Sequence, residues 1–356
     1  MLFQPSFKKV LAGVVVIVAG CATMPGREST EIVWPEPPLT ARIRFIGLLR
    51  NQDDLRELSA GRETGQSVMA LLLGEKTIAS ALKQPMDAVV SRGGQRLYVT
   101  DYAKPGVFVF DFEARTVRPL GEAGLLKTPF GIALDDQDNV YVADSGPKLI
   151  YVFDPQGAQR TTITHPSLER PTGLAIDTAR RRLYVADPPS QTIKVFDLEG
   201  TYRNVLGGEG TPAGHFASPT YLAVDGTGHL YVTDTLDAQV KVLDADGRRV
   251  RTVGEHGDAY GMLDKPKGVA VDSLGNVYVV DSAWSNVQIF NQQGQVLLFF
   301  GGRGRVPGLL FNPAGLTIDA DNRIYGVDAF NARVALYELI NTKAEDSVMQ
   351  PKGGGP

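Results

Sequence analysis

The sequence contains very little cysteine and histidine. A single cysteine, Cys21, stands among 356 residues, so no disulfide can form within the chain and packing alone must hold its fold. Only four histidines are present, and no two have the His-x-x-x-His spacing of a local metal-binding motif. The sequence therefore predicts no cofactor and no locally encoded catalytic metal centre.

The chain also lacks an excess of positive charge and an apolar run long enough to span a bilayer. Its formal net charge is −4 at pH 7, which argues against nucleic acid as a partner. An apolar stretch at residues 10–19 follows Lys8 and Lys9, but as a helix it would be only about 15 Å long, half of a bilayer core. It predicts a signal peptide over residues 1–20 rather than a membrane span.

A repeated motif dominates the remaining sequence. The dipeptide Tyr-Val, once Tyr-Gly, is followed two residues later by Asp at Tyr98/Asp101, Tyr141/Asp144, Tyr184/Asp187, Tyr231/Asp234, Tyr278/Asp281 and Tyr325/Asp328. The successive spacings are 43, 43, 47, 47 and 47 residues. A period this long and regular indicates a repeat architecture.

Each repeat predicts four antiparallel strands. In the copy that begins at Pro266, β-branched and aromatic runs alternate with turns at Gly275 and Gly294. One such sheet cannot bury both of its faces, whereas sheets packed radially around an axis cover each other. A β-solenoid is the alternative, but its coils are shorter, roughly 20–30 residues. We therefore expect an all-β fold, a six-bladed β-propeller of four-stranded blades over residues 85–340.

The last repeat lacks a fourth strand. After its third strand, Val334 to Glu338, the chain is polar and ends in a glycine-rich tail. Upstream of all repeats, Ile43 to Leu48 is similar in pattern to the other fourth strands. We expect this segment, within residues 41–51, to pair with the last blade and close the ring, because closure removes an exposed edge. Residues 52–84 would form an insertion with a short helix near Val68 to Leu72, and residues 341–356 a disordered tail.

Several sequence blocks resemble NHL repeats, namely Gly214 to Pro219, Gly268 to Asp272, Asn276 to Val279, and Asn331 with Arg333. The resemblance implies a six-bladed propeller within residues 41–340 that binds protein, peptide, nucleic acid or glycan on one face. The first repeat departs from the pattern, because it has Met86-Asp87-Ala88 where glycine is typical.

The end of the predicted signal peptide, Val18-Ala19-Gly20-Cys21, resembles the lipobox of bacterial lipoproteins. The resemblance implies that Cys21 carries the lipid and becomes the first residue of the mature chain. Residues 21–40 are rich in proline and would form an extended tether. With Ala22 after the cysteine, the lipoprotein sorting pattern implies the outer membrane of the bacterial cell envelope, facing either the periplasm or the exterior.

The repeated carboxylates are predicted to be structural. An aspartate required once in every repeat is typical of a residue that caps a turn through its side chain, so a functional residue should break the symmetry. The loops after the second strands differ between blades, and their candidate ligand-binding residues are Tyr102, Leu236, Trp284, Phe330 and Asn331. Exposed aromatic groups anchor partners or stack on sugars; alternatively, these side chains pack against the loops between blades.

Three histidines occupy equivalent loops between blades, His165, His215 and His256. If they converged on the axis they could hold zinc, and related propeller lyases use loop histidines, but no partner acid is identifiable. Two functions of different classes therefore remain open, besides a purely structural role in envelope organisation. We favour a lipid-anchored binding or scaffold protein of the cell envelope that uses one propeller face to bind an unidentified protein, peptide or glycan. The alternative is a lyase or hydrolase with a metal or acidic site at the axial mouth.

Overall fold

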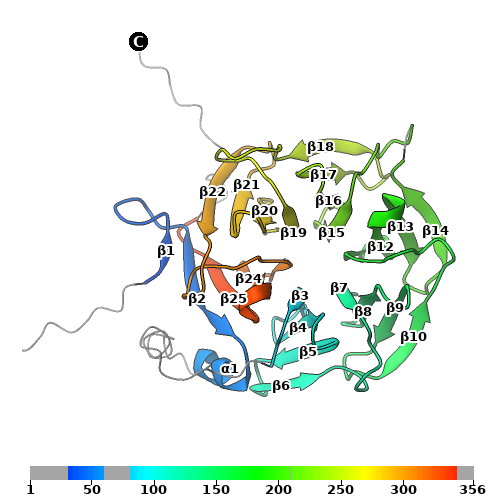
Figure 1. The fold of residues 1–356 in the computed structure, drawn as a ribbon, viewed down its shortest axis with the longest axis horizontal. Helices are drawn as coiled ribbons and strands as arrows, with labels where there is room; N and C mark the ends of the chain where they lie inside the picture. Colours follow the sequence, from blue (N-terminus) through cyan, green and yellow to red (C-terminus); the bar gives the residue numbers. More distant parts are fainter. Residues whose placement is uncertain (1–30, 60–80, 209, 343–356) are drawn as a thin grey trace, which may run out of the picture. The chain divides into compact units, whose positions relative to one another are not determined.

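The computed structural model describes residues 31–59, 81–208 and 210–342. These residues form six antiparallel sheets, which Figure 1 shows as blades around a ring. The predicted all-β six-bladed propeller is confirmed. The predicted signal peptide, the lipidation site Cys21, the helix near Val68 to Leu72 and the tail from residue 343 lie outside the described residues.

The first three blades each have four strands in chain order. Blade 1 consists of β3 (Pro85–Val90), β4 (Arg96–Asp101), β5 (Gly106–Asp111) and β6 (Thr116–Pro119). Blade 2 consists of β7 (Pro129–Leu134), β8 (Val140–Asp144), β9 (Leu149–Phe153) and β10 (Gln159–Ile163). Blade 3 consists of β11 (Leu174–Asp177), β12 (Arg182–Asp187), β13 (Thr192–Asp197) and β14 (Tyr202–Leu206), with the short helix η1 (Pro188–Ser190) before β13.

The next three blades continue the pattern, with a variation in the last. Blade 4 consists of β15 (Pro219–Val224), β16 (Leu230–Asp234), β17 (Gln239–Leu243) and β18 (Arg249–Val253). Blade 5 consists of β19 (Pro266–Val271), β20 (Val277–Asp281), β21 (Asn286–Phe290) and β22 (Val296–Gly301). Blade 6 consists of β23 (Leu316–Ile318), β24 (Arg323–Asp328), η2 (Ala329–Asn331), β25 (Arg333–Leu339), β2 (Ile43–Leu49) and β1 (Val33–Trp34).

The antiparallel order gives the ring two distinct faces. One face, here called the loop face, carries the loops from second to third strands and the connections between blades. The other, here called the turn face, carries the turns from first to second and from third to fourth strands. Second strands such as β20 are buried at every position, because a neighbouring blade covers each side of the sheet.

In blades 2, 4, 5 and 6, the tyrosine and the aspartate of the Tyr-Val-x-Asp motif hold the second strand at its two ends. In blade 5, the hydroxyl of Tyr278 donates to Asp272 Oδ2 at 3.1 Å on the turn face. Asp281 accepts the backbone N–H of Asp264 at 2.7 Å on the loop face. The corresponding aspartates of the other blades accept backbone N–H groups from the segment that precedes each blade. The repeated aspartates are therefore structural, as the sequence predicted.

Blade 6 joins segments that are distant in sequence. β2 pairs antiparallel with β25, with Ile43 opposite Leu339 and Leu49 opposite Val334, and this confirms the predicted closing strand. The predicted tether of residues 21–40 extends too far, because Val33 and Trp34 form β1 and pair with β2. Trp34 makes aromatic contacts that favour this pairing. Its ring centroid lies 5.8 Å from that of Tyr337.

A short helix follows the closing strand. α1 (Gln52–Ser59) begins where the side chain of Asn51 accepts the backbone N–H groups of Asp53 and Asp54 at 2.9 and 3.1 Å. Leu55 faces the core between the closing strand and blade 1 and is fully buried. Among the described residues, no helix is long and apolar enough to cross a membrane.

Candidate functional site

The loop face carries a group of exposed apolar side chains. Tyr102, Leu236, Trp284 and Phe330 lie in the second-to-third-strand loops of blades 1, 4, 5 and 6, and their side chains are 49, 75, 41 and 54% exposed. We call these four residues the rim. Blades 4, 5, 6 and 1 follow one another in the ring, so the rim occupies one continuous arc of the loop face (Figure 1).

Two further exposed apolar side chains lie in connections between these blades and were missed by the sequence analysis. Tyr260 lies in the connection between blades 4 and 5, and Val306 in the connection between blades 5 and 6. Both connections contain the extra residues of the longer 47-residue periods. An apolar residue within an enlarged loop was therefore the sequence signal for both side chains. Loops of this kind commonly carry function.

Buried cations hold the rim loops in place. The guanidinium of Arg333 donates to Asp328 Oδ2 at 2.7 Å and to the backbone carbonyls of Arg305 and Leu309 at 2.9 Å each. In blade 4, Lys241 Nζ lies 2.7 Å from Asp234 Oδ2 and 2.9 Å from the carbonyl of His215. Each cation joins a blade to the connection before it, which gives the loops a fixed backbone.

The side chains of Asn331 and Phe330 differ in how far contacts within the protein occupy them. The amide of Asn331 donates to Asp328 Oδ2 at 2.7 Å and to the carbonyl of Gly304 at 2.9 Å, so this predicted ligand-binding side chain supports the loop scaffold. Phe330 packs edge-on against Phe311, with ring centroids 5.5 Å apart, but remains about half exposed. Its outer edge therefore stays accessible to a partner.

The symmetry of the ring is broken near its axis. The third residue of each first-strand segment is glycine in four blades, where the inner strands approach one another closely; these residues are Gly131, Gly173, Gly268 and Gly315. A Cβ at Gly131 would lie 2.2 Å from the carbonyl oxygen of Thr172 in the next blade. The equivalent positions in blades 1 and 4 are Asp87 and Tyr221, which face each other across a ring of six.

Asp87 and Tyr221 fill the centre of the ring together. The Tyr221 hydroxyl donates to the carbonyl of Met86 in the opposite blade at 3.1 Å, and its ring lies 5.5 Å from that of Phe130. Asp87 accepts the backbone N–H of Ala88 at 2.9 Å and that of Ile132 at 3.3 Å. Both side chains are almost fully buried.

Burial raises the pKa values of both members of this axial pair. It raises the pKa of Asp87 to about 7, although the two backbone N–H groups oppose the shift. Burial, and then the charge of Asp87, raise the pKa of Tyr221 well above its ordinary value. Lys267 on β19 has a lowered pKa, first because of burial and then because of Lys265. Asp87, which replaces the typical glycine in the first repeat, is therefore a titratable group with a raised pKa.

The three loop histidines do not gather at the axis. His165 stacks on Tyr202 of the outer strand β14, with ring centroids 4.2 Å apart, and its Nδ1 lies 2.7 Å from Ser167 Oγ. His256 is exposed, with Nε2 3.9 Å from Asp264 Oδ1. Within residues 31–59, 81–208 and 210–342, no three His, Cys, Asp or Glu side chains come together as a metal site requires.

Comparison with known families agrees with this architecture. The SMP-30/Gluconolactonase/LRE-like region (SGL) matches residues 76–186, and the NHL repeat matches residues 263–290. The matched segments overlap blades 1 to 3 and blade 5, so parts of this six-bladed propeller are similar to SGL and NHL proteins. A search of the curated proteins found no match.

Solved structures share the fold at low sequence identity. An auxiliary nutrient binding protein from Bacteroides thetaiotaomicron has a TM-score of 0.60 and 12% identity, over 73% of this chain and 70% of that chain. A protein of unknown function from the same organism has a TM-score of 0.58 and 17% identity over the same shares. Virginiamycin B lyase from Staphylococcus aureus has a TM-score of 0.54 and 10% identity, over 72% and 80% of the two chains.

Proposed function

We propose that this protein is a lipid-anchored binding module of the bacterial cell envelope, which holds a protein, peptide or glycan on its loop face. The observation that carries the proposal is the rim, four large apolar side chains that remain exposed on one arc of that face. Exposed apolar groups gathered in one region favour an interaction site, whereas isolated ones are ordinary on protein surfaces.

The chemistry of the rim suits recognition. Trp284, Tyr102 and Phe330 offer flat surfaces that stack on sugar rings or fill pockets in a protein, and aromatic residues are enriched among the strongest contacts of interfaces. The anchored loops around Arg333 add rigidity, which lowers the entropy lost on binding. The auxiliary nutrient binding protein with the same fold provides a precedent for binding.

The test compares three forms of the full chain. These are the wild type, the double variant Trp284→Ala/Phe330→Ala, and a control double variant Val205→Ala/Val250→Ala, which removes exposed apolar groups from the outer strands β14 and β18. Each is incubated with solubilised envelope and with a glycan array, and retained partners are quantified. We expect the rim variant to lose its main partner at least tenfold while the control keeps it. Identical partner sets for all three would reject the rim as the binding surface.

The anchor is tested separately through Cys21. Lipidation of this single cysteine would hold the propeller at the membrane, and two acyl chains give stable attachment where one does not. We expect Cys21→Ser to move the protein from the membrane fraction to the soluble fraction with altered processing. Unchanged processing and fractionation would contradict the envelope location without bearing on the rim.

A second candidate function is a lyase or hydrolase with an acidic site at the axial mouth. It is favoured by Asp87, because a carboxyl group with a pKa of about 7 is suited to proton transfer near neutral pH. Turnover of lactones or other cyclic esters by the wild type, lost in Asp87→Asn, would support this function. Turnover that Asp87→Asn leaves unchanged would exclude Asp87 from it.

A further inference from the structure

A cavity of about 480 Å³ lies on blade 3, toward the turn face and away from the rim. Its residues come from the turn between β11 and β12 and from the strands β12, β13 and β14; they include Arg180, Arg181, Arg182, Arg203, Val195 and Asn204. Cavities of a few hundred Å³ are typical of small-molecule sites. Three of the arginines are consecutive in sequence, a basic run that the overall negative charge obscured.

Three arginines of the cavity are positioned by ion pairs that do not use all of their N–H donors. Arg180 Nη1 lies 2.9 Å from Asp177 Oδ2, and Arg203 Nη2 lies 2.6 Å from Asp197 Oδ2. Arg181 Nη2 forms an ion pair with Glu199. Each pair uses one nitrogen of a guanidinium that carries five N–H donors. These carboxylates therefore orient the arginines without occupying their full donor set.

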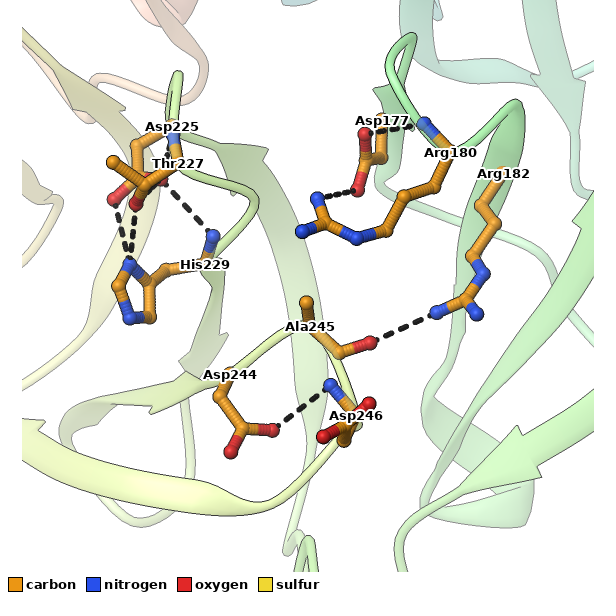
Figure 2. A network of polar contacts seen from close by, with 9 residues as sticks. All are labelled: Asp177, Arg180, Arg182, Asp225, Thr227, His229, Asp244, Ala245 and Asp246. Atoms are coloured by element: carbon orange, nitrogen blue, oxygen red, sulfur yellow. Dashed lines mark hydrogen bonds and ion pairs between the residues drawn. The ribbon is translucent and has the colours of Figure 1, made fainter.

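Arg182 differs from its neighbours because it has no carboxylate partner within the part of the chain that the structure describes. Its Nη1 donates instead to the backbone carbonyl of Ala245 at 2.8 Å. Figure 2 shows Arg182 reaching from blade 3 to the turn of blade 4 that holds Ala245 and Asp246. A carbonyl oxygen fixes the guanidinium but does not neutralise it, so its positive charge remains available to a ligand.

Blade 4 also shapes the position of Arg180. A Cβ at Gly228 would lie 2.0 Å from Arg180 Nη1, so the guanidinium packs directly on the backbone of the neighbouring blade. Four guanidinium groups and two carboxylates, Asp197 and Glu199, line the cavity, while Asp177 and Asp246 act on Arg180 from outside that lining. The lining thus has more positive than negative groups.

We propose that this cavity binds a small molecule through a phosphate group. Planar guanidinium forks match the oxygens of a phosphate, and arginine is preferred over lysine where several such contacts converge. The volume exceeds that needed for a phosphate ion alone, and Val195 and Asn204 offer an apolar and an amide contact to the remainder of the molecule. The site is independent of the rim and of the function proposed for it.

Isothermal titration calorimetry of the full chain tests the proposal with three probes: inorganic phosphate, glucose 6-phosphate and uncharged glucose. We expect saturable binding of at least one phosphate probe, none of glucose, and weaker affinity as salt is raised. Tighter binding of glucose 6-phosphate would identify a phosphate ester as the ligand class, and equal binding would identify the free ion. No saturable binding of either phosphate probe at millimolar concentration would overturn the proposal.

Variants show whether the binding is located in this cavity. Arg182→Ala and Arg203→Ala are each expected to weaken phosphate binding at least tenfold, and Arg182→Lys to weaken it less because the charge is kept without the fork. Arg170→Ala, at an exposed arginine in the connection between blades 2 and 3 on the loop face, is the matched control and should bind as the wild type does. Because Arg203 is largely exposed, its variant keeps the test available if Arg182→Ala fails to fold. Equal losses in Arg203→Ala and Arg170→Ala would contradict the assignment.

Discussion

The hydroxyl of Tyr221 donates a hydrogen bond to the backbone carbonyl of Met86, 3.1 Å away, from the opposite side of the ring. The same carbonyl accepts the backbone N–H of Gly315 at 2.9 Å. Blades 1, 4 and 6 are therefore linked at one atom. Contacts between neighbouring blades hold most propellers together, and here a single side chain adds a link across the diameter.

Replacing Tyr221 with phenylalanine removes that link while keeping the aromatic ring. We expect a loss of about 1 kcal/mol in the free energy of unfolding, the usual value for one buried hydrogen bond. Denaturant unfolding measures the difference. Tyr102→Phe, which changes an exposed hydroxyl, serves as control and should have no effect; equal stability of Tyr221→Phe and wild type would show that the bond contributes nothing.

The stability of the protein should depend on the protonation of Asp87. Its folded-state pKa of about 7 lies above the ordinary value of 3.8, so the folded state holds the proton more tightly than the unfolded state. Its contribution is therefore fully present below pH 4 and is lost as the pH rises through 7. The total change is about 4 kcal/mol by linkage.

Asp87→Asn tests this dependence, because asparagine resembles the protonated acid and does not titrate. We expect the variant to be more stable than the wild type at pH 8 and similar to it at pH 4, as measured by unfolding across that range. Asp136→Asn, at an exposed aspartate, should leave the pH profile unchanged. A profile for Asp87→Asn parallel to that of the wild type would contradict the assigned pKa.

The axial glycines should tolerate no side chain. Gly131→Ala would place Cβ 2.2 Å from the backbone carbonyl oxygen of Thr172, and backbone cannot move aside as a flexible side chain can. We expect a loss of about 3 kcal/mol or more, as for severe overpacking. Gly226→Ala, where no atom lies within 4 Å of the added Cβ, should change the melting temperature little. Comparable melting temperatures for the two variants would refute the close approach of the inner strands.

The closing strand should contribute to the stability of the whole ring. Leu49 is fully buried on β2, so Leu49→Ala is expected to cost about 2–5 kcal/mol. Leu39→Ala removes an exposed leucine from the same N-terminal segment and should be nearly neutral. Thermal unfolding of both variants gives the comparison, and a neutral Leu49→Ala would mean that β2 is dispensable.

The fold was predictable because its information is repeated. Five copies of Tyr-Val-x-Asp and one of Tyr-Gly-x-Asp mark the second strands. The fourth strand missing after Val334 to Glu338 pointed to Ile43 to Leu48. The two-residue strand β1 was not predicted, since a segment as short as Val33–Trp34 shows no periodicity and pairs only because Trp34 finds aromatic partners in the folded protein.

The candidate sites were harder to predict because they depend on which repeats become neighbours. The rim residues could be found as differences between equivalent loops. The relation of Asp87 to Tyr221 could not, because the two are far apart in sequence and only the closed ring brings opposite blades together. The arginine cavity depends on Ala245 and Gly228 of the next blade, whose backbone atoms give no sequence signal of their own.

The position of β25 between β24 and β2 makes blade 6 depend on both ends of the chain. The first five blades are each made of consecutive strands, whereas β2 lies far from its partner β25 in sequence and joins the ring only through it. A premature stop before Arg333 would therefore detach β1 and β2 from the ring as well, and would leave the outer edge of β24 unpaired.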